Sequence, residues 1–234
     1  MVERQLVELD VAGSIPVSHP NNVELKIRHT FAAKSMNMDM KTTDNYRKHK
    51  TQSSLQRTLL DRFTSTLVRE VKTLKPTTVL DVGCGEGFTL ERLRKAKVGK
   101  HLEGIDFLEL AIKLGQKEHP QLILKKGSAY DLKYKDNSFD VVICSEVLEH
   151  LDDPEKALSE IVRVSKKYCV LSVPNEPFFM LGNLARGKNI SRFGNDIEHI
   201  NHWAFWQFKK FVGKKIKVKK MLYPTPWTLI IAEK

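Results

Sequence analysis

The sequence predicts an α/β protein built on an open, doubly wound and mostly parallel sheet of seven strands. Strand-like and helix-like segments alternate from residue 77 onward, as they do when helices cross between parallel strands. Several of the strands are continuously apolar rather than alternating, which is typical of strands covered on both faces. The last two strands follow each other across the short stretch "YPTPW" and predict a C-terminal β-hairpin, with one strand inserted antiparallel.

An amphipathic helix precedes this series. Its apolar residues recur at three- and four-residue steps over 53–74, Ser53 or Ser54 can cap its start, and Pro76 ends it. The strands are expected at 77–82, 101–106, 122–127, 139–145, 168–174, 215–222 and 227–233. The helices between them are expected at 87–96, 107–117, 154–165 and 204–212, and Asp153 should cap the third, with Pro154 at its first position.

The chain divides into a short arm and one domain. Residues 1–40 have weak periodicity and scattered turn residues, so a poorly ordered N-terminal arm is expected there. Residues 41–234 form the domain, with a helical segment at 41–76 and an irregular insertion at 175–203. The insertion carries apolar residues that could line a pocket for a lipophilic molecule or pack an added helix: Phe178, Phe179, Met180, Leu181 and Leu184.

The net charge of +11 has its densest cluster in "KKIKVKK" at 214–220. Ile216 and Val218 alternate there with lysines, which predicts a strand with one solvated face, and lysines commonly protect the edge of a sheet. A nucleic-acid or anionic-lipid partner stays open as the alternative. No apolar run approaches the roughly 18 residues of a membrane span. The N-terminus lacks a secretory pattern, and Cys84, Cys144 and Cys169 are widely spaced, so reduced cysteines in a cytoplasmic protein are expected.

The stretch "VLDVGCGEG" at 79–87 is the strongest functional signal. Glycines at every second position after an apolar strand let a ligand approach the backbone and direct a helix N-terminus at it. A dinucleotide site would need a third glycine where Phe88 stands, which disfavours a nicotinamide dehydrogenase. Asp106 ends the second strand and could accept hydrogen bonds from both hydroxyls of a ribose, or cap the following helix.

From about residue 46 to 233, the chain resembles the class I S-adenosylmethionine-dependent methyltransferases, and most of all the branch of the ubiquinone and menaquinone biosynthesis methyltransferases. "VLDVGCGEG" resembles the first motif of that family, "GIDF" the second, and "GSAYDLKYKDNSFDVVICSEVLEHL" the third and fourth. The resemblance implies the Rossmann-like methyltransferase fold and S-adenosyl-L-methionine as cofactor. It implies cofactor contacts from Asp81, Gly83, Cys84, Gly85, Gly87, Asp106, Phe107, Ser128, Ala129, Ser145 and Glu146.

The same resemblance gives the flanking segments their expected roles. Residues 41–76 would form a lid over the cofactor, with Tyr46 and His49 as candidates, and residues 175–203 the wall over the methyl acceptor. One position departs from the family pattern: Ser128 stands where an acid usually receives the adenine amino group. Either Ser128 serves there, or Asp131 substitutes for it.

Candidate catalytic residues lie in two short segments. A general base is needed only where the acceptor must lose a proton. Glu149 and His150 in "SEVLEHLDD" and His199 and His202 in "EHINHW" are the candidates, although the histidine of the first segment commonly packs beneath the site instead. No metal is assigned. The same residues nevertheless resemble the Glu-x-x-Glu-His segment and later histidine of the small-RNA 3′-terminal 2′-O-methyltransferases, which hold a divalent ion.

The sequence therefore predicts an S-adenosylmethionine-dependent methyltransferase acting through oxygen or carbon on a small acceptor, either lipophilic or linked to a glycan. A metal-assisted RNA 2′-O-methyltransferase and a non-catalytic, cofactor-binding partner subunit are the alternatives. The identity of the acceptor, the oligomeric state and the role of residues 1–40 are left open.

Overall fold

The computed structural model describes residues 42–185, 187, 190–196 and 198–234, and the expected N-terminal arm at 1–40 lies outside them. Seven strands form one sheet in the order β3-β2-β1-β4-β5-β7-β6. The first five pair in parallel, and β7 lies antiparallel between β5 and β6. The strands are β1 (Thr78–Val82), β2 (His101–Asp106), β3 (Ile123–Lys126), β4 (Phe139–Ser145), β5 (Ser165–Pro174), β6 (Lys217–Leu222) and β7 (Trp227–Glu233). The predicted mostly parallel sheet and its C-terminal hairpin are confirmed.

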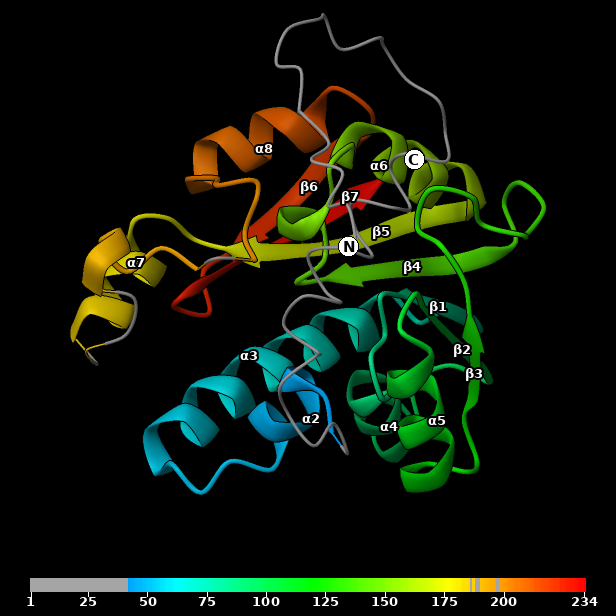
Figure 1. The fold of residues 1–234 in the computed structure, drawn as a ribbon. Coiled ribbons are helices and arrows are strands. Elements are labelled where there is room, and N and C mark those ends of the chain that lie inside the picture. Colours follow the sequence, from blue (N-terminus) through cyan, green and yellow to red (C-terminus); the bar gives the residue numbers. More distant parts are fainter. Residues whose placement is uncertain (1–41, 186, 188–189, 197) are drawn as a thin grey trace, which may run out of the picture. The chain divides into compact units, whose positions relative to one another are not determined.

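Helices cover both faces of this sheet, as doubly wound topology requires (Figure 1). One buried apolar cluster joins the sheet to α6 and α8, and the other joins it to α3, α4 and α5. The helices are α2 (Asp44–His49), α3 (Ser54–Thr73), α4 (Phe88–Lys95), α5 (Glu109–Glu118), α6 (Pro154–Val164), α7 (Phe178–Ala185) and α8 (Phe205–Gly213), with 3₁₀ turns η1 (Leu148–His150) and η2 (Ile190–Arg192).

Local signals set most of the helix ends. The Asp153 side chain accepts a hydrogen bond from the Lys156 N–H at 3.0 Å, and Pro154 is the first residue of α6, as predicted. The helix expected at 107–117 instead begins at Glu109, because the Asp106 carboxylate accepts the Leu108 N–H at 2.8 Å and Leu108 is extended. Within the helical segment expected at 41–76 the sequence patterns gave bounds only for α3, and they gave none for α2 or α7.

The lysine-rich strand β6 lies at the edge of the sheet, where its pattern placed it. Lys219 pairs with Glu233, and Lys220 with the buried Glu70, each at 2.7 Å. In the described part of the chain, every helix is too short or too polar to cross a membrane.

The strand order reverses between β1 and β4, so the carboxyl ends of these two strands flank the switch point of the sheet. Ligands of open α/β sheets bind at such a point, because the loops on either side diverge there. The glycine turn follows β1, and the segment that holds Ser145 to His150 follows β4. The fold thus brings the two motif-bearing loops side by side.

Candidate functional site

The glycine turn has left-handed backbone at all three alternating glycines, with φ of 76°, 54° and 81° at Gly83, Gly85 and Gly87. A side chain at Gly83 would also meet the protein itself, since a Cβ there would lie 2.2 Å from a methyl carbon of Val147. The N–H groups of Gly83 and Cys84 both donate to the Ile105 carbonyl, at 2.8 and 2.9 Å, and tie the turn to β2. The glycines therefore serve the packing of the turn as well as the approach of a ligand.

Asp106 fastens the same turn from the end of β2. One of its carboxylate oxygens accepts the Gly85 N–H and the other the Leu108 N–H, both at 2.8 Å. Burial raises the pKa of this carboxyl. A carboxylate offers about four acceptor positions, so the two backbone bonds leave about two for a diol. Asp106 thus orders the loop before α5, without being the capping residue of that helix.

Two further predicted residues lie beneath the turn. Asp81 in β1 is buried, and burial, followed by the charge of Asp106, raises its pKa to about 7. Cys84 is buried as well, and burial raises the pKa of its thiol well above the ordinary value. At pH 7 the Cys84 side chain is therefore a neutral thiol, and the Asp81 carboxyl is about half protonated.

Ser128 lies in a tight turn after β3 and its hydroxyl accepts the Tyr130 N–H at 3.2 Å. The Asp131 carboxylate, considered above as its substitute, forms an ion pair with Lys133 on the surface. Ala129 is half-buried and packs against the core, and Phe107 is half-buried after β2. Of the two residues considered for adenine, Asp131 is thus already engaged with a cation.

Glu146 follows β4 in a left-handed conformation, with φ of 58°, which is uncommon for a residue other than glycine. Its N–H donates to the Ser172 carbonyl at 3.1 Å, and its carboxylate accepts the Ser172 hydroxyl at 3.2 Å and the Trp227 indole N–H. Ser145 and Ser172 share a hydroxyl–hydroxyl hydrogen bond of 2.9 Å. Burial raises the pKa of Glu146 to about 7. Sequence reasoning missed Trp227, which lies 81 residues away.

A buried acid inside the glycine motif holds the N-terminal helix. Glu86 is fully buried, and its two carboxylate oxygens accept hydrogen bonds from the Thr43 hydroxyl and from the Asn45 amide, the latter at 2.6 Å. In the same segment, the His49 ring stacks on Phe88 with centroids 4.2 Å apart. These contacts place α2 against the glycine turn. Sequence reasoning had no role for Glu86, although an acid within a buried glycine loop is itself an unusual feature.

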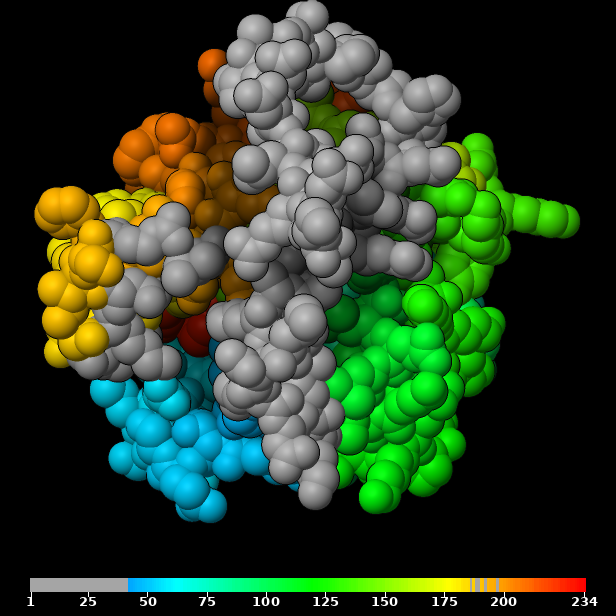
Figure 2. All heavy atoms as spheres, viewed as in Figure 1, coloured from blue at the N-terminus to red at the C-terminus, as the bar shows by residue number. Residues whose placement is uncertain are grey.

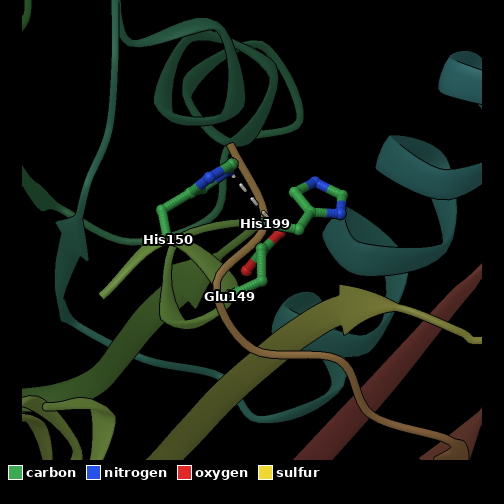
Figure 3. A group of neighbouring side chains, drawn as sticks. All are labelled: Glu149, His150 and His199. Atoms are coloured by element: carbon green, nitrogen blue, oxygen red, sulfur yellow. Dashed lines mark ion pairs between the residues drawn. The ribbon is translucent and has the colours of Figure 1, made fainter. Parts of the chain in front are cut away.

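Glu149, His150 and His199 form a compact group on the other side of the switch point (Figure 3). The N–H groups of Ile200 and Asn201 donate to the Glu149 carbonyl at 2.8 and 2.9 Å, which fastens the 198–201 segment onto η1. The rings of His150 and His199 lie 5.0 Å apart. Backbone pairing thus brings together residues that are 49 positions apart in the sequence.

Within this group Glu149 is buried and the two histidines are half-buried. The side chain of Glu149 is almost fully buried, and among the described residues neither of its carboxylate oxygens has a hydrogen-bond partner. Burial raises the pKa of Glu149 well above the ordinary value, lowers that of His150, and lowers that of His199 to about 4. Burial thus disfavours the charged form of all three side chains.

His202 lies beside this group rather than in it. Its ring centroid is 6.2 Å from that of His199, one ring nitrogen lies 3.9 Å from a Glu176 oxygen, and the other contacts the Asn195 amide at 3.2 Å. Of the four predicted catalytic candidates, the structure brings three into one cluster and leaves His202 exposed at its margin.

The apolar residues of α7 do not pack into the core. Phe178 and Leu181 are 54% and 56% exposed, and only Asn183 of this helix is buried. Phe179 points the other way and approaches the His199 ring at 5.3 Å. In Figure 2 the insertion and α8 occupy adjoining areas of the surface, in yellow and orange. Of the two roles considered for these residues, the packing of a core helix is therefore not what the structure shows.

Comparison with known proteins gives a family match for the central part of the chain. Residues 80–173 match the family described as a methyltransferase domain. The chain is 38% identical over 88 residues to a demethylmenaquinone methyltransferase of Renibacterium salmoninarum, a match that covers 38% of this chain and 36% of that protein. It is 36% identical over 93 residues to a ubiquinone biosynthesis O-methyltransferase of Hahella chejuensis, covering 38% of each. The chain thus matches well under half of the length of these curated relatives.

The fold is shared over a longer stretch. The crystal structure of magnesium protoporphyrin IX methyltransferase from Synechocystis PCC 6803, with bound S-adenosylhomocysteine, superposes with a TM-score of 0.67. The superposition covers 90% of this chain and 99% of that one, at 17% sequence identity. At this identity the likeness establishes the architecture of the sheet and helices.

Proposed function

Because residues 80–173 belong to the class I S-adenosylmethionine-dependent methyltransferases, we propose that this chain transfers the cofactor's methyl group to a small lipophilic acceptor. The observation that carries the proposal is the glycine turn, with three left-handed glycines held to the Asp106 carboxylate at the switch point of the sheet. A ligand there meets the N-terminus of α4 and the remaining acceptor positions of Asp106.

We infer the following position for the cofactor. Asp106 would accept the ribose hydroxyls, Phe107 would flank the adenine, and Ser128 with the Ala129 backbone would meet its edge. The methionine end would lie over Gly83, Gly85 and Gly87, between Asp81 with Cys84 below and Ser145 with Glu146 at the rim. The half-neutralised state of Asp81 and Glu146, with pKa values of about 7, supports this end of the placement, because a nearby sulfonium and ammonium would favour their ionised forms.

Methyl transfer itself is an in-line displacement. The oxygen or carbon of the acceptor forms a bond to the methyl carbon while the carbon–sulfur bond breaks, and its electron pair neutralises the sulfonium. The electrophile is supplied by the cofactor, so the protein contributes alignment and exclusion of water. The α2 helix, held by Glu86 against the glycine turn, is suited to exclude water as the predicted lid.

Two observations support a lipophilic acceptor. The exposed apolar side chains of α7, Phe178 and Leu181, lie on the same short helix as Phe179, which contacts His199. The two curated relatives are named for demethylmenaquinone and ubiquinone biosynthesis.

The three free cysteines, all buried, support a reducing compartment such as the cytoplasm.

Proton removal from an acceptor hydroxyl would fall to Glu149, His150, His199 or His202. The neutral imidazoles of His150 and His199 can accept a proton, but a pKa of about 4 makes His199 a weak base. The direct general-base role is therefore best supported for His150, whose other ring nitrogen is fixed by the Glu198 carbonyl at 2.8 Å.

The test is transfer of label from methyl-labelled cofactor into cell extracts incubated with the purified protein, followed by mass spectrometry. We expect label in the organic-solvent fraction. Label in RNA would favour the 2′-O-methyltransferase alternative, and label in water-soluble oligosaccharides a glycan-linked acceptor. Tight S-adenosylhomocysteine binding without any labelled product would favour a non-catalytic subunit, and binding of NAD instead would overturn the proposal.

A further inference from the structure

The side chains of Glu149, His150 and His199 are arranged like a set of metal ligands. One oxygen of Glu149 and one nitrogen of each imidazole all lie within 4.8 Å of one another. Atoms bonded to a common ion at about 2.1 Å stand roughly 3 to 3.5 Å apart. The three groups would have to close by about 1 Å, a movement within the reach of side-chain rotation.

The unsatisfied carboxyl of Glu149 is a second, independent observation that indicates a ligand at this position. Its side chain is 1% exposed, and among the described residues both of its oxygens lack a hydrogen bond. Buried polar groups are almost always satisfied, and an orphaned pair of carboxyl oxygens carries a substantial desolvation cost. Figure 3 shows this carboxyl directed to the space between the two rings.

The neighbouring histidine is oriented as a metal ligand would be. The Nδ1 of His150 bonds the Glu198 carbonyl at 2.8 Å, and its Nε2 lies 4.0 Å from the Glu149 oxygen. A backbone carbonyl that takes the proton of one ring nitrogen leaves a lone pair on the other, which is how proteins fix the tautomer of ligating histidines. His199 is held in position by the pairing of the next two residues with the Glu149 carbonyl.

Two neighbouring acids are less suited to the role. Both oxygens of Glu146 are already bonded, one to Ser172 and one to Trp227. A second group, Glu176 with His199 and His202, includes an exposed histidine, and Glu176 accepts the Met180 N–H at 3.2 Å. Only the first group among the described residues combines burial with an unsatisfied carboxylate.

We propose that Glu149, His150 and His199 bind one divalent ion of the zinc, cobalt or iron(II) type. Two imidazoles and one carboxylate suit these borderline ions, and leave open positions for an exogenous ligand.

The role of the ion rests on the proposed function. An acceptor hydroxyl bound at an open position would have its pKa lowered, so its proton would pass to solvent without a strong protein base. The oxygen would then form its bond to the methyl carbon as the carbon–sulfur bond breaks and the electron pair returns to sulfur. With its Nε2 bound to the ion, His150 would serve as a ligand and not as the general base considered above.

The test uses the full chain, stripped with chelator and titrated with Co²⁺, with visible absorption and thermal unfolding as readouts. We expect one equivalent to bind and, at about 100-fold excess over Kd, to raise Tm by about 5 °C or more. Glu149→Gln should weaken Co²⁺ binding about tenfold or more. Its Tm in chelator should equal or exceed that of the wild type, because the lost carboxyl had no partner, and this result separates loss of a ligand from loss of the fold.

His202→Ala is the matched histidine control and should bind Co²⁺ like the wild type. The proposal is overturned if the wild type binds no Co²⁺, if Glu149→Gln binds it equally well, or if only His202→Ala loses it, which would assign the other group. Binding of S-adenosylhomocysteine in chelator is measured alongside. Its absence would count against the proposed function, and its presence with no Co²⁺ binding against the metal site alone.

Discussion

Replacement of Asp106 by alanine should weaken cofactor binding without unfolding the protein. The Asp106 carboxylate has about four acceptor positions, and the N–H groups of Gly85 and Leu108 occupy two. The cofactor's ribose would use the other two. A hydrogen bond to a charged group contributes about 1.5–3 kcal/mol, and water entering the vacated space would offset part of the loss of the second bond. We therefore expect a loss of about 1.5–3 kcal/mol, or roughly a 10- to 150-fold increase in Kd.

The assay is calorimetric titration with S-adenosylhomocysteine at a temperature where circular dichroism shows each variant to be folded. Asp106→Asn separates the two functions of the side chain, since its carbonyl can still accept one of the backbone N–H groups. Glu109→Ala, an exposed change three residues further on, is the control and should leave Kd unaltered. A Kd for Asp106→Ala within about twofold of the wild type, in a folded protein, would remove Asp106 from the ribose.

Three more changes test the turn, the helix held against it and the ion pair between the buried Glu91 and Arg94. Gly83→Ala should destabilise the protein by about 2–4 kcal/mol in urea unfolding, from left-handed strain and collision, whereas Gly213→Ala should be neutral or gain up to about 1 kcal/mol. Glu86→Ala removes both bonds to α2, so amide exchange in that helix should accelerate about tenfold or more. Glu91→Gln should lower the free energy of unfolding at pH 7. Its difference from the wild type should disappear as the pH falls from about 5 to 2.

The sign of the last effect follows from the Glu91 pKa, which hydrogen bonds from Arg94 lower to about 2. A depressed folded-state pKa contributes stability above the unfolded pKa and loses it as pH falls through the folded one. A deficit that is constant from pH 7 to 2 would show that the charge of Glu91 is not responsible. Equal stability losses for Gly83→Ala and Gly213→Ala, or unchanged exchange in α2 for Glu86→Ala, would contradict the other two arguments.

The sequence predicted the parts of the fold that depend on local pattern. The strands expected at 101–106, 139–145 and 227–233 match β2, β4 and β7 to the residue, and Asp153 with Pro154 marked the start of α6. The lysine alternation placed β6 at the sheet edge. These features are determined by side chains close in sequence, so periodicity and capping rules are sufficient to find them.

The features that escaped prediction depend on distant residues. The α2 helix has no buried side chain of its own and is held by Glu86, about 40 positions further along. Glu146 finds its partner in Trp227, and His199 joins Glu149 through backbone bonds across 50 residues. The sequence identified the residues of the candidate site, but only the folded chain shows that His202 lies outside the cluster and that Glu149 is unsatisfied.

Because β7 lies between β5 and β6, the completion of the sheet during folding depends on β7. Since β6 pairs only with β7 in the described sheet, it is connected to the rest of the sheet only through β7. An incomplete sheet would expose the edge of β5 to pairing with other chains. Trp227, the first residue of β7, donates its indole N–H to Glu146, which lies at the proposed rim of the cofactor site. The pairing of β7 with β5 thus completes both the sheet and the proposed rim of the cofactor site. The appearance of cofactor affinity during refolding should therefore show when β7 has paired.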